Sequence, residues 1–368
     1  MKALRFVKKN IVFCIAAVAA LITCFLVPPD KAYLKYIDWK TLSCLFLTLA
    51  VVCALRNIKF FTILARKLVT MAGNLRTLFL LLIVITFIGS MIIANDMALI
   101  TFLPLGYFAL SVIGLEKYMA YLFVLQNISA NLGGMLTPFG NPQNLYLYSY
   151  FNIPTGEFCR IMLPAFLLSV ALLVVACLPV KPIKFSIDKD FGEKLNKNKT
   201  ILYIILFLAS VLIVFRVIPF VIGLVVIPVI LYFVDRDALK MVDYALLGTF
   251  FFFFIFAGNL ARLDSVNALI STLLQKDTLL VSVLACQLIS NVPSAILLSR
   301  FTGDYAALLL GVNIGGTGTL IASLASLITF SEFKLLHPEQ TKKYLCIFAV
   351  ANLVFLLVLT FSTKLFWL

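Results

Sequence analysis

Charged side chains are scarce inside the long apolar runs of this 368-residue chain, and it has few residues for common enzyme chemistry. The single histidine, His337, lies in a charged loop beside Pro338, which excludes a two-histidine zinc motif or a histidine relay. No G-x-x-x-x-G-K-S/T loop occurs, so the chain by itself does not use ATP. Neither a serine–histidine pair nor a metal cluster is visible, so we do not expect an enzyme and expect no cofactor.

Two further patterns are not seen: cysteine spacing typical of metal sites, and the cleavage pattern of a leader peptide. The eight cysteines lie in or beside apolar segments without C-x-x-C spacing, so we interpret them as small buried hydrophobic residues. The first apolar run, 11–27, follows a basic stretch at 1–9, but no small-x-small cleavage pattern comes after it. We therefore expect it to be retained as a first membrane helix.

Apolar residues dominate what is present, at 63% of the chain. Apolar runs long enough to cross a bilayer of about 30 Å recur throughout, and they lack the strict alternation of a barrel strand. The net charge of +14 does not predict nucleic-acid binding, because most lysines and arginines fall in loops on one side of the expected topology. The sequence predicts a multi-pass helical protein of the plasma (inner) membrane with a cytoplasmic N-terminus.

The stretch NLGGMLTPFGNPQN, residues 131–144, interrupts one of these apolar runs. Gly133, Gly134, Pro138, Gly140 and Pro142 lie within ten positions of one another, and a regular helix does not pass through so many breakers. Unpaired backbone groups are tolerated in lipid only where they line a protein cavity, and transporters build binding sites from such broken helices. An ordinary loop at the membrane surface is the alternative.

A second copy of the pattern favours the binding site. Residues 311–326, GVNIGGTGTLIASLAS, repeat the Asn-x-Gly-Gly step, and each break is preceded by a short polar interruption of an apolar run. These interruptions are Asn95-Asp96 and Ser290-Asn291. An interruption followed by a break, twice in one chain, is typical of a transporter with corresponding discontinuous segments in its two halves.

The chain is therefore expected to be all-α, with two inverted repeats that each contain a re-entrant helical hairpin and a broken transmembrane helix. Two full spans with an external turn are the alternative to the first hairpin. The expected division is a first repeat at 1–180 (hairpin 76–115, broken helix 118–153), a cytoplasmic linker at 181–199, and a second repeat at 200–368 (hairpin 279–298, broken helix 306–330). We also expect an amphipathic interfacial helix at 59–72 and a cytoplasmic loop at 331–343.

Asp96 is the single acidic residue in the middle of an apolar run. An ionisable group at membrane depth costs several kcal/mol by insertion scales, so its presence indicates a function. Burial disfavours the ionised carboxylate and a bound cation favours it, so Asp96 is a candidate proton carrier or cation ligand. A structural role as a helix cap at the hairpin tip is the alternative.

No lysine or arginine lies in the interruptions or the breaks. Recognition of an anion would rest on helix N-termini and on amide or hydroxyl donors, with a co-bound cation supplying positive charge. An ionised Asp96 would repel an anion unless it is protonated or neutralised by that cation. The donors are Asn141, Asn144, Asn291, Thr317 and Thr319.

With these four motifs in order, the chain resembles the ion transporter superfamily, which includes citrate-transporter-like, divalent-anion/sodium symporter, arsenite-permease and sodium/proton-antiporter branches. ANDMALITFLPL is similar to the arsenite-permease form of the first hairpin tip, and NLGGMLTPFGNPQN is similar to the broken fifth helix. SNVPSAILLS and NIGGTGTLIASLAS resemble the second hairpin and break. At the tips the chain has Asn-Asp-Met and Ser-Asn-Val where the sodium-dicarboxylate branch has Ser-Asn-Thr, and it is a span shorter than typical members.

The resemblance implies a solute site between the hairpin tips and the broken helices, with alternating access by movement of that unit, often in homodimers. Carried onto this sequence, the solute-binding residues would be Asn95, Asn141, Pro142, Asn144, Asn291, Asn313 and Thr317. A first cation site would use Asn95, Asp96, Gly134, Thr137 and Asn141. A second would use Ser290, Asn291, Gly315, Gly316 and Thr319, and sodium is the one metal expected.

We therefore expect a secondary active transporter that moves a small-molecule or inorganic anion, or an oxyanion, coupled to Na⁺ or H⁺. A proton-coupled arsenite or antimonite exporter and a sodium/proton antiporter are the alternatives within the resemblance. A passive channel belongs to a different class and would need a continuous polar lining, whereas the polar groups here are confined to two places. The expected partners are the solute and the lipid bilayer, without nucleic acid.

Overall fold

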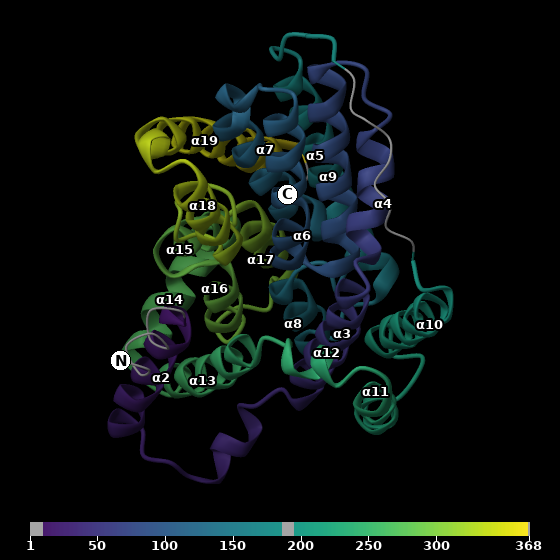
Figure 1. Cartoon of the computed structure of the whole chain (residues 1–368). Coiled ribbons are helices and arrows are strands. Elements are labelled where there is room, and N and C mark those ends of the chain that lie inside the picture. Colours follow the sequence, from purple (N-terminus) through teal and green to yellow (C-terminus); the bar gives the residue numbers. More distant parts are fainter. Residues whose placement is uncertain (1–9, 186–194, 367–368) are drawn as a thin grey trace.

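The computed structural model describes residues 10–185 and 195–366, and within these ranges the chain is built from helices. One isolated backbone bridge, Asn74 to Lys184, is the nearest approach to a strand pair there. Seven of the described helices are long and apolar enough to cross a membrane, and four shorter ones are apolar as well (Figure 1). The predicted class, an all-α multi-pass membrane protein, is confirmed.

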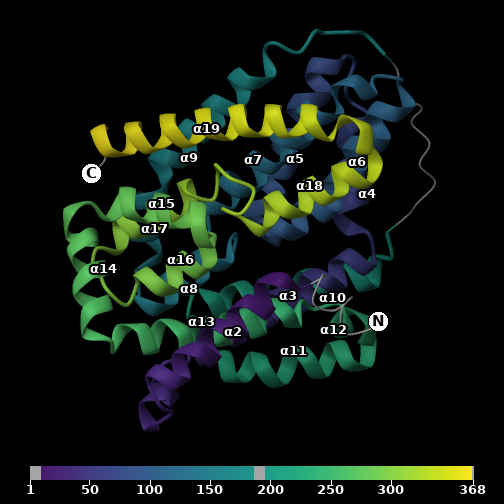
Figure 2. The ribbon, with the colours of Figure 1, turned by 90° about the vertical axis from the view of Figure 1, so that its left-hand side faces the viewer.

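One set of helices, which we call the flanking group, lies together in the lower part of Figure 2. In this group α2 packs along α13, and α3 packs against α10, α11 and α12. Asp38 and Asp243 cap α3 and α13 by accepting hydrogen bonds from main-chain N–H groups three residues on. The group comprises α2 (Ile11–Leu26), α3 (Trp39–Asn57), α10 (Lys197–Val214), α11 (Phe220–Val234), α12 (Arg236–Lys240) and α13 (Tyr244–Ala261).

The remaining α-helices, apart from α4 and α14, form the hairpin group, in which α5 packs on α6 and α7, and α15 packs on α16 and α17. The two other helices join the groups: α4 (Phe60–Val69) contacts α3, α5 and α6, and α14 (Asp264–Lys276) contacts α13 and α15. The group comprises α5 (Leu75–Ile93), α6 (Asn95–Val112), α7 (Met119–Gly133), α8 (Pro142–Tyr150), α9 (Thr155–Cys177), α15 (Thr278–Ile289), α16 (Asn291–Leu298), α17 (Tyr305–Ile314), α18 (Leu324–Leu336) and α19 (Thr341–Phe366).

Both polar interruptions are helix-to-helix turns. Ala94 alone separates α5 from α6, and Ser290 alone separates α15 from α16, each with a positive φ. The turns lie where hairpin tips are predicted, within the ranges 76–115 and 279–298. Whether the pairs are re-entrant, and whether the two halves are inverted repeats, remain predictions.

Both glycine-rich stretches interrupt helices as well. After α7 the chain makes a short 3₁₀ turn, Gly134–Leu136, and α8 then starts with Pro142 at its first position, where a missing N–H costs nothing. The second break separates α17 from α18, which Ser323 caps. Both breaks lie in the ranges predicted for broken helices, 118–153 and 306–330.

Two differences concern the ends of the expected segments. The stretch 331–343, expected to be a loop, is largely helical, because α18 continues to Leu336 and α19 already begins at Thr341. Glu332 and Lys334 are tolerated within α18 because both are exposed at its end. The basic residues 1–9 used for orientation, and residues 186–194 of the predicted linker, lie outside the described residues.

Candidate functional site

The two turns place an asparagine at the start of the helix that follows. The Oδ1 atom of Asn95 accepts a hydrogen bond from the N–H of Asp96, and Oδ1 of Asn291 accepts one from the N–H of Val292, both at 2.9 Å. Both asparagines are buried. Each amide therefore satisfies a free N–H at a helix start, so at the first tip Asn95 fills the capping role that was considered for Asp96.

Asn131 on α7 connects the first tip to the second break. Its Oδ1 atom accepts hydrogen bonds from Nδ2 of Asn95 at 3.2 Å and from Oγ of Ser323 at 2.8 Å. Ser323 also caps α18, so one oxygen of the first half binds the residue that starts a helix of the second half.

Asn313 on α17 makes the reciprocal connection. Its Oδ1 accepts a hydrogen bond from Nδ2 of Asn141 at 3.1 Å, and its Nδ2 donates to Oδ1 of Asn144 at 2.6 Å. Asn141 and Asn144 lie at the start of α8. All three side chains are buried, so each unsatisfied amide group would carry a substantial desolvation cost. Asn131 and Asn313 each lie just before a glycine pair. Asn131 thus binds the start of α18 in the second half, and Asn313 binds the start of α8 in the first half.

The exposed carbonyls of the first break are held by one side chain. The Nδ2 atom of Asn144 lies 3.1 Å from the carbonyl oxygens of Gly134 and Met135 and 3.3 Å from that of Thr137. Because Oδ1 of Asn144 accepts from Asn313, the amide is oriented with its nitrogen toward the break.

The second break is held in the same way by Gln287, on α15. Its Nε2 atom donates to the carbonyl oxygens of Gly315 at 2.8 Å and Thr317 at 3.1 Å. Its Oε1 atom accepts from the main-chain N–H of Thr319 at 2.8 Å, which fixes the orientation of the amide. A neutral amide therefore stands at each place where broken-helix carbonyls would otherwise face a cation.

The predicted cation ligands are near one another in each half, but their hydroxyl groups have main-chain partners. Thr137 donates to the carbonyl of Met91 at 2.7 Å, and Thr319 donates to that of Gln287 at 3.2 Å. Among the predicted solute ligands, Thr317 donates to Ile314 at 2.6 Å. A Cβ built on Gly134 would lie 2.3 Å from Oδ1 of Asn141, so glycine is needed for this close approach.

A cavity of about 320 Å³ lies where the two tips and the two breaks meet. It is lined by the first residues of α6, α8, α16 and α18, so four helix N-termini converge on it. The predicted residues on its wall are Asn95, Asp96, Pro142, Ser290 and Asn291. The other predicted residues do not line it, and Thr319 among them is exposed. They are Gly134, Thr137, Asn141, Asn144, Asn313, Gly315, Gly316, Thr317 and Thr319.

The opposite wall of this cavity belongs to α2 and α13. It is apolar except for Thr249, and Phe253 and Phe256 are its largest side chains. No lysine, arginine or histidine lines the cavity in the part of the chain that the structure describes. Asp96 is the one charged group on the wall, and its buried Oδ1 atom has no hydrogen-bond partner among those residues.

The cavity continues toward one end of the spans. A second cavity of about 530 Å³ shares Thr249 with it, as well as apolar residues of α2, α13 and α18. Its far end is bordered by Asn10, Asp243 and Glu332. The two together form a cleft between the flanking and hairpin groups, and we call this far end the cleft mouth.

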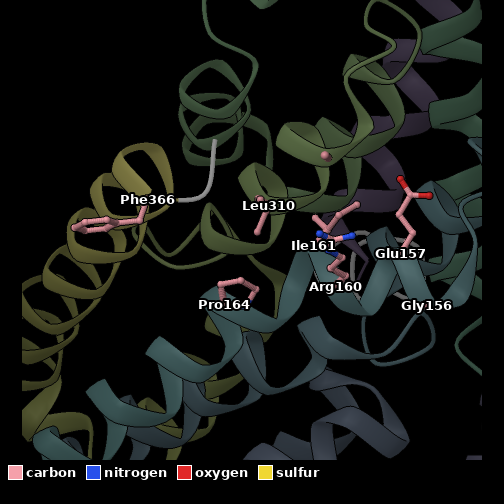
Figure 3. Close-up of a pocket in the computed structure, with 8 residues that line it drawn as sticks. Gly156, Glu157, Arg160, Ile161, Pro164, Leu310 and Phe366 are labelled. Carbon is pink, nitrogen blue, oxygen red and sulfur yellow. The ribbon is translucent and has the colours of Figure 1, made fainter.

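A larger cavity of about 820 Å³ lies elsewhere, between α9, α17 and the end of α19. Figure 3 shows Glu157 and Arg160 on α9 and Phe366 on α19 around it. It contains none of the predicted site residues. We therefore place the candidate site at the smaller cavity, where the tips and breaks meet.

Sequence reasoning missed four polar residues of this site. Asn131 and Gln143 lie in the stretch 131–144 but were not assigned to the site, and Gln287 and Ser323 were not singled out. Gln287 precedes the second tip by three residues inside an apolar run, and that is the signal available for it. Ser323 lies directly before an apolar helix start, as an N-cap does.

Comparisons with known proteins find transporters similar to this chain. Residues 3–307 match the family model described as citrate transporter. The chain is 33% identical over 342 residues to an uncharacterized transporter of Methanocaldococcus jannaschii, covering 90% of this chain and 91% of that protein. It is 29% identical to the inner membrane protein YbiR of Escherichia coli, covering 83% and 82%. A silicon efflux transporter of Oryza sativa is 31% identical over 161 residues, which are 43% of this chain and 32% of that protein.

Proposed function

The chain belongs to the citrate transporter family of the ion transporter superfamily, and from that premise we propose that it is a secondary active transporter of a small anion or oxyanion. It is a multi-pass membrane protein of a transporter family, not an enzyme, and a small-molecule solute follows from that membership. The solute class, the coupling ion and the residues that bind them are the content of the proposal.

The convergence of four helix N-termini on one cavity carries the proposal. Each N-terminus directs the positive end of a helix dipole toward the cavity, which favours an anion without a lysine or arginine. The wall supplies further donors from the amide groups of Asn95, Gln143 and Asn291. A small oxyanion would find hydrogen-bond donors on one side and the apolar α2–α13 wall on the other.

The coupling ion in this proposal is H⁺ rather than Na⁺. Sodium in a broken-helix site is coordinated by main-chain carbonyls, and here the amides of Asn144 and Gln287 already donate to those carbonyls. The remaining ionisable group on the cavity wall is Asp96. A protonated Asp96 carries no charge and can donate a hydrogen bond to an anion, whereas its carboxylate repels one, so solute and proton bind together.

The cycle then alternates the exposure of this cavity. The solute and the proton on Asp96 enter through the cleft mouth, between the flanking and hairpin groups. Movement of the hairpin group past α2 and α13 closes the mouth and opens the other end. The apolar α2–α13 wall suits this movement because it offers few hydrogen bonds that would have to break.

Transport by the purified protein in liposomes tests the proposal. Labelled citrate, phosphate, sulfate and arsenite are each offered with a pH gradient, and in parallel with a sodium gradient at uniform pH. We expect one of these solutes to accumulate with the pH gradient and none with sodium alone. Failure of all four to exchange across the membrane would contradict the transport of a small anion.

A proton-coupled exporter of an uncharged metalloid acid is the second candidate. The similarity to a silicon efflux transporter and the uncharged character of the cavity wall around Asp96 favour it. Its discriminating experiment is growth on arsenite, antimonite or silicic acid after deletion of the gene. Increased sensitivity would support export, and accumulation driven by an inward proton gradient would support the anion proposal.

A further inference from the structure

Two arginines join the flanking group to the hairpin group at the end of the spans away from the cleft mouth. We propose that Arg216 and Arg300 are positioning residues for transport, which hold that end closed while the mouth is open. The inference rests on the proposed function, because it assigns the closed end of an alternating-access cycle. It concerns how the two helix groups are held, and not which solute they carry.

Arg216 belongs to the turn between α10 and α11, in the flanking group. Its Nη2 atom donates to the carbonyl oxygen of Tyr148, on α8, at 2.6 Å, and its guanidinium carbon lies 4.3 Å from the centre of the Tyr148 ring. Arg216 has a φ of 66°, a conformation that costs most residues free energy. The strained backbone therefore occurs at Arg216 itself, whose side chain binds the end of α8.

Arg300 makes the second connection in the opposite direction. It follows α16, in the hairpin group, and its Nη2 donates to the carbonyl oxygen of Tyr36, in the loop before α3, at 2.8 Å. Its guanidinium carbon lies 5.1 Å from the ring of Tyr150, near the end of α8. The ring of Tyr36 is itself fixed, because it packs directly on Gly258, where an added Cβ would lie 2.4 Å from it.

The direction of the helices places these contacts opposite the mouth. In the parallel pair α2–α13, Phe13 packs beside Gly248, and Asn259 donates to Thr23 at 3.2 Å. The mouth residues Asn10 and Asp243 directly precede these two helices. Tyr36, packed on Gly258, belongs to their other end, so the arginine contacts and the mouth lie at opposite ends of the cleft.

The chemistry of the two contacts suits a closure that must be released. Both acceptors are main-chain carbonyls, which cannot change charge, and both arginines also lie over a tyrosine ring. The Nε atom of each arginine is buried and has no hydrogen-bond partner within the described ranges. Each guanidinium therefore uses only some of its N–H donors to hold its partner. Separation of the flanking group from the hairpin group breaks few hydrogen bonds.

Distances between spin labels on the two groups test this inference. We would replace the four cysteines that are not buried (Cys14, Cys24, Cys159 and Cys346) by alanine. Labels are then attached to Lys35→Cys in the flanking group and Gly303→Cys in the hairpin group, where both positions are exposed and a Cβ on Gly303 meets nothing within 4 Å. Pulsed electron resonance gives the distance distribution.

For the double variant R216Q/R300Q we expect a second, longer distance whose population is about threefold or more above that of the parent, because the bonds that favour the closed end are gone. The matched control is R236Q. Arg236 has the same chemistry as Arg216, donating to the carbonyl of Tyr232 at 3.0 Å with its guanidinium 4.2 Å from that ring, but both residues belong to the flanking group. It should leave the distribution unchanged.

A folded double variant with the parent's distribution, or an equal shift in R236Q, would overturn the inference. If the double variant does not fold, R216Q and R300Q are measured singly and interpreted in the same way. These distances need no solute. A parent protein that transports nothing would thus count against the proposed function and leave the test of the two arginines intact.

Discussion

Ala94 and Ser290, the single residues at the two helix-to-helix turns, have nearly the same backbone conformation. Their φ and ψ angles are 68° and 154° for Ala94, and 75° and 159° for Ser290. This region of φ and ψ is populated essentially by glycine, and other residues in it cost about 1–3 kcal/mol. The two halves of the chain therefore use one strained turn, without glycine, to start α6 and α16 at the cavity.

Replacing these residues by glycine should stabilise the protein. In A94G and S290G the relief of strain exceeds the extra backbone entropy of glycine, so we expect each to raise the free energy of unfolding by about 1 kcal/mol. Thermal unfolding of the purified protein measures this. The control is A268G on an exposed face of α14, where glycine should cost about 1 kcal/mol; equal losses in all three would show that the turns are unstrained.

Asp96→Asn should uncouple transport without unfolding the protein. The amide keeps the shape of the carboxyl group and cannot carry the proton, so we expect exchange of the labelled solute to persist while accumulation driven by a pH gradient disappears. Thermal unfolding checks that the variant is folded. Accumulation with an unchanged pH dependence in D96N would refute the proton-carrying role.

Gln287→Leu should destabilise the protein. The change leaves the carbonyls of the buried residues Gly315 and Thr317 without this donor, and unsatisfied buried groups cost about 1–3 kcal/mol each in water-soluble proteins and less within membranes. We expect a total loss of about 2–4 kcal/mol by these values. Gln340→Leu, at an exposed amide bonded only to Glu339, is the control; a loss as small in Q287L would show that Gln287 does not hold the break.

Sodium should not stabilise the protein. Because amide nitrogens already bind the break carbonyls, exchange of potassium for sodium at constant ionic strength should leave the thermal midpoint unchanged, whereas a ligand of the native state would raise it. Differential scanning fluorimetry of the purified protein makes this comparison. A sodium-dependent rise would show that one of the predicted cation sites is occupied, and the coupling proposal would change accordingly.

Gly133→Ala should disrupt the packing of α7 on α5. A Cβ at this position would lie 2.3 Å from the carbonyl oxygen of Phe87, a main-chain atom that cannot turn aside. Overpacking of this kind costs about 1–3 kcal/mol. Gly156→Ala on α9 is the control, because its Cβ meets nothing within 4 Å and alanine favours a helix, so a small gain is expected there. Equal midpoints for both variants would contradict the close approach.

The positions of the turns and breaks could be predicted from the sequence because their residues are locally incompatible with a helix. A helix is interrupted at these positions without any contribution from distant partners. This holds for Pro142, for the two glycine pairs and for the polar residues at the tips. The interactions across the halves depend on partners that are far apart in the sequence, such as Asn313 and Asn144, which are 169 positions apart. Gln287 was missed for a related reason. The sequence around it is an apolar helix, and the partners of its amide belong to the second break, about thirty residues further on.

The resemblance does not separate residues that line the cavity from residues that lie behind its wall. Asn95, Asp96 and Asn291 face the cavity, whereas Asn141 and Asn313 bind each other one layer deeper. That distinction depends on side-chain direction at the end of a helix, which a motif does not encode. The assignment of individual residues to the solute or the ion remains a prediction.

The apolar face that α2 and α13 present to the cavity has an evolutionary consequence. In the proposed site, selectivity would depend on the few side chains at the starts of α6, α8, α16 and α18, because Phe253, Phe256 and their neighbours would distinguish solutes only by bulk. A lineage could therefore change the nutrient or toxin that it transports through a few substitutions at those four helix starts, while the rest of the protein is inherited unaltered.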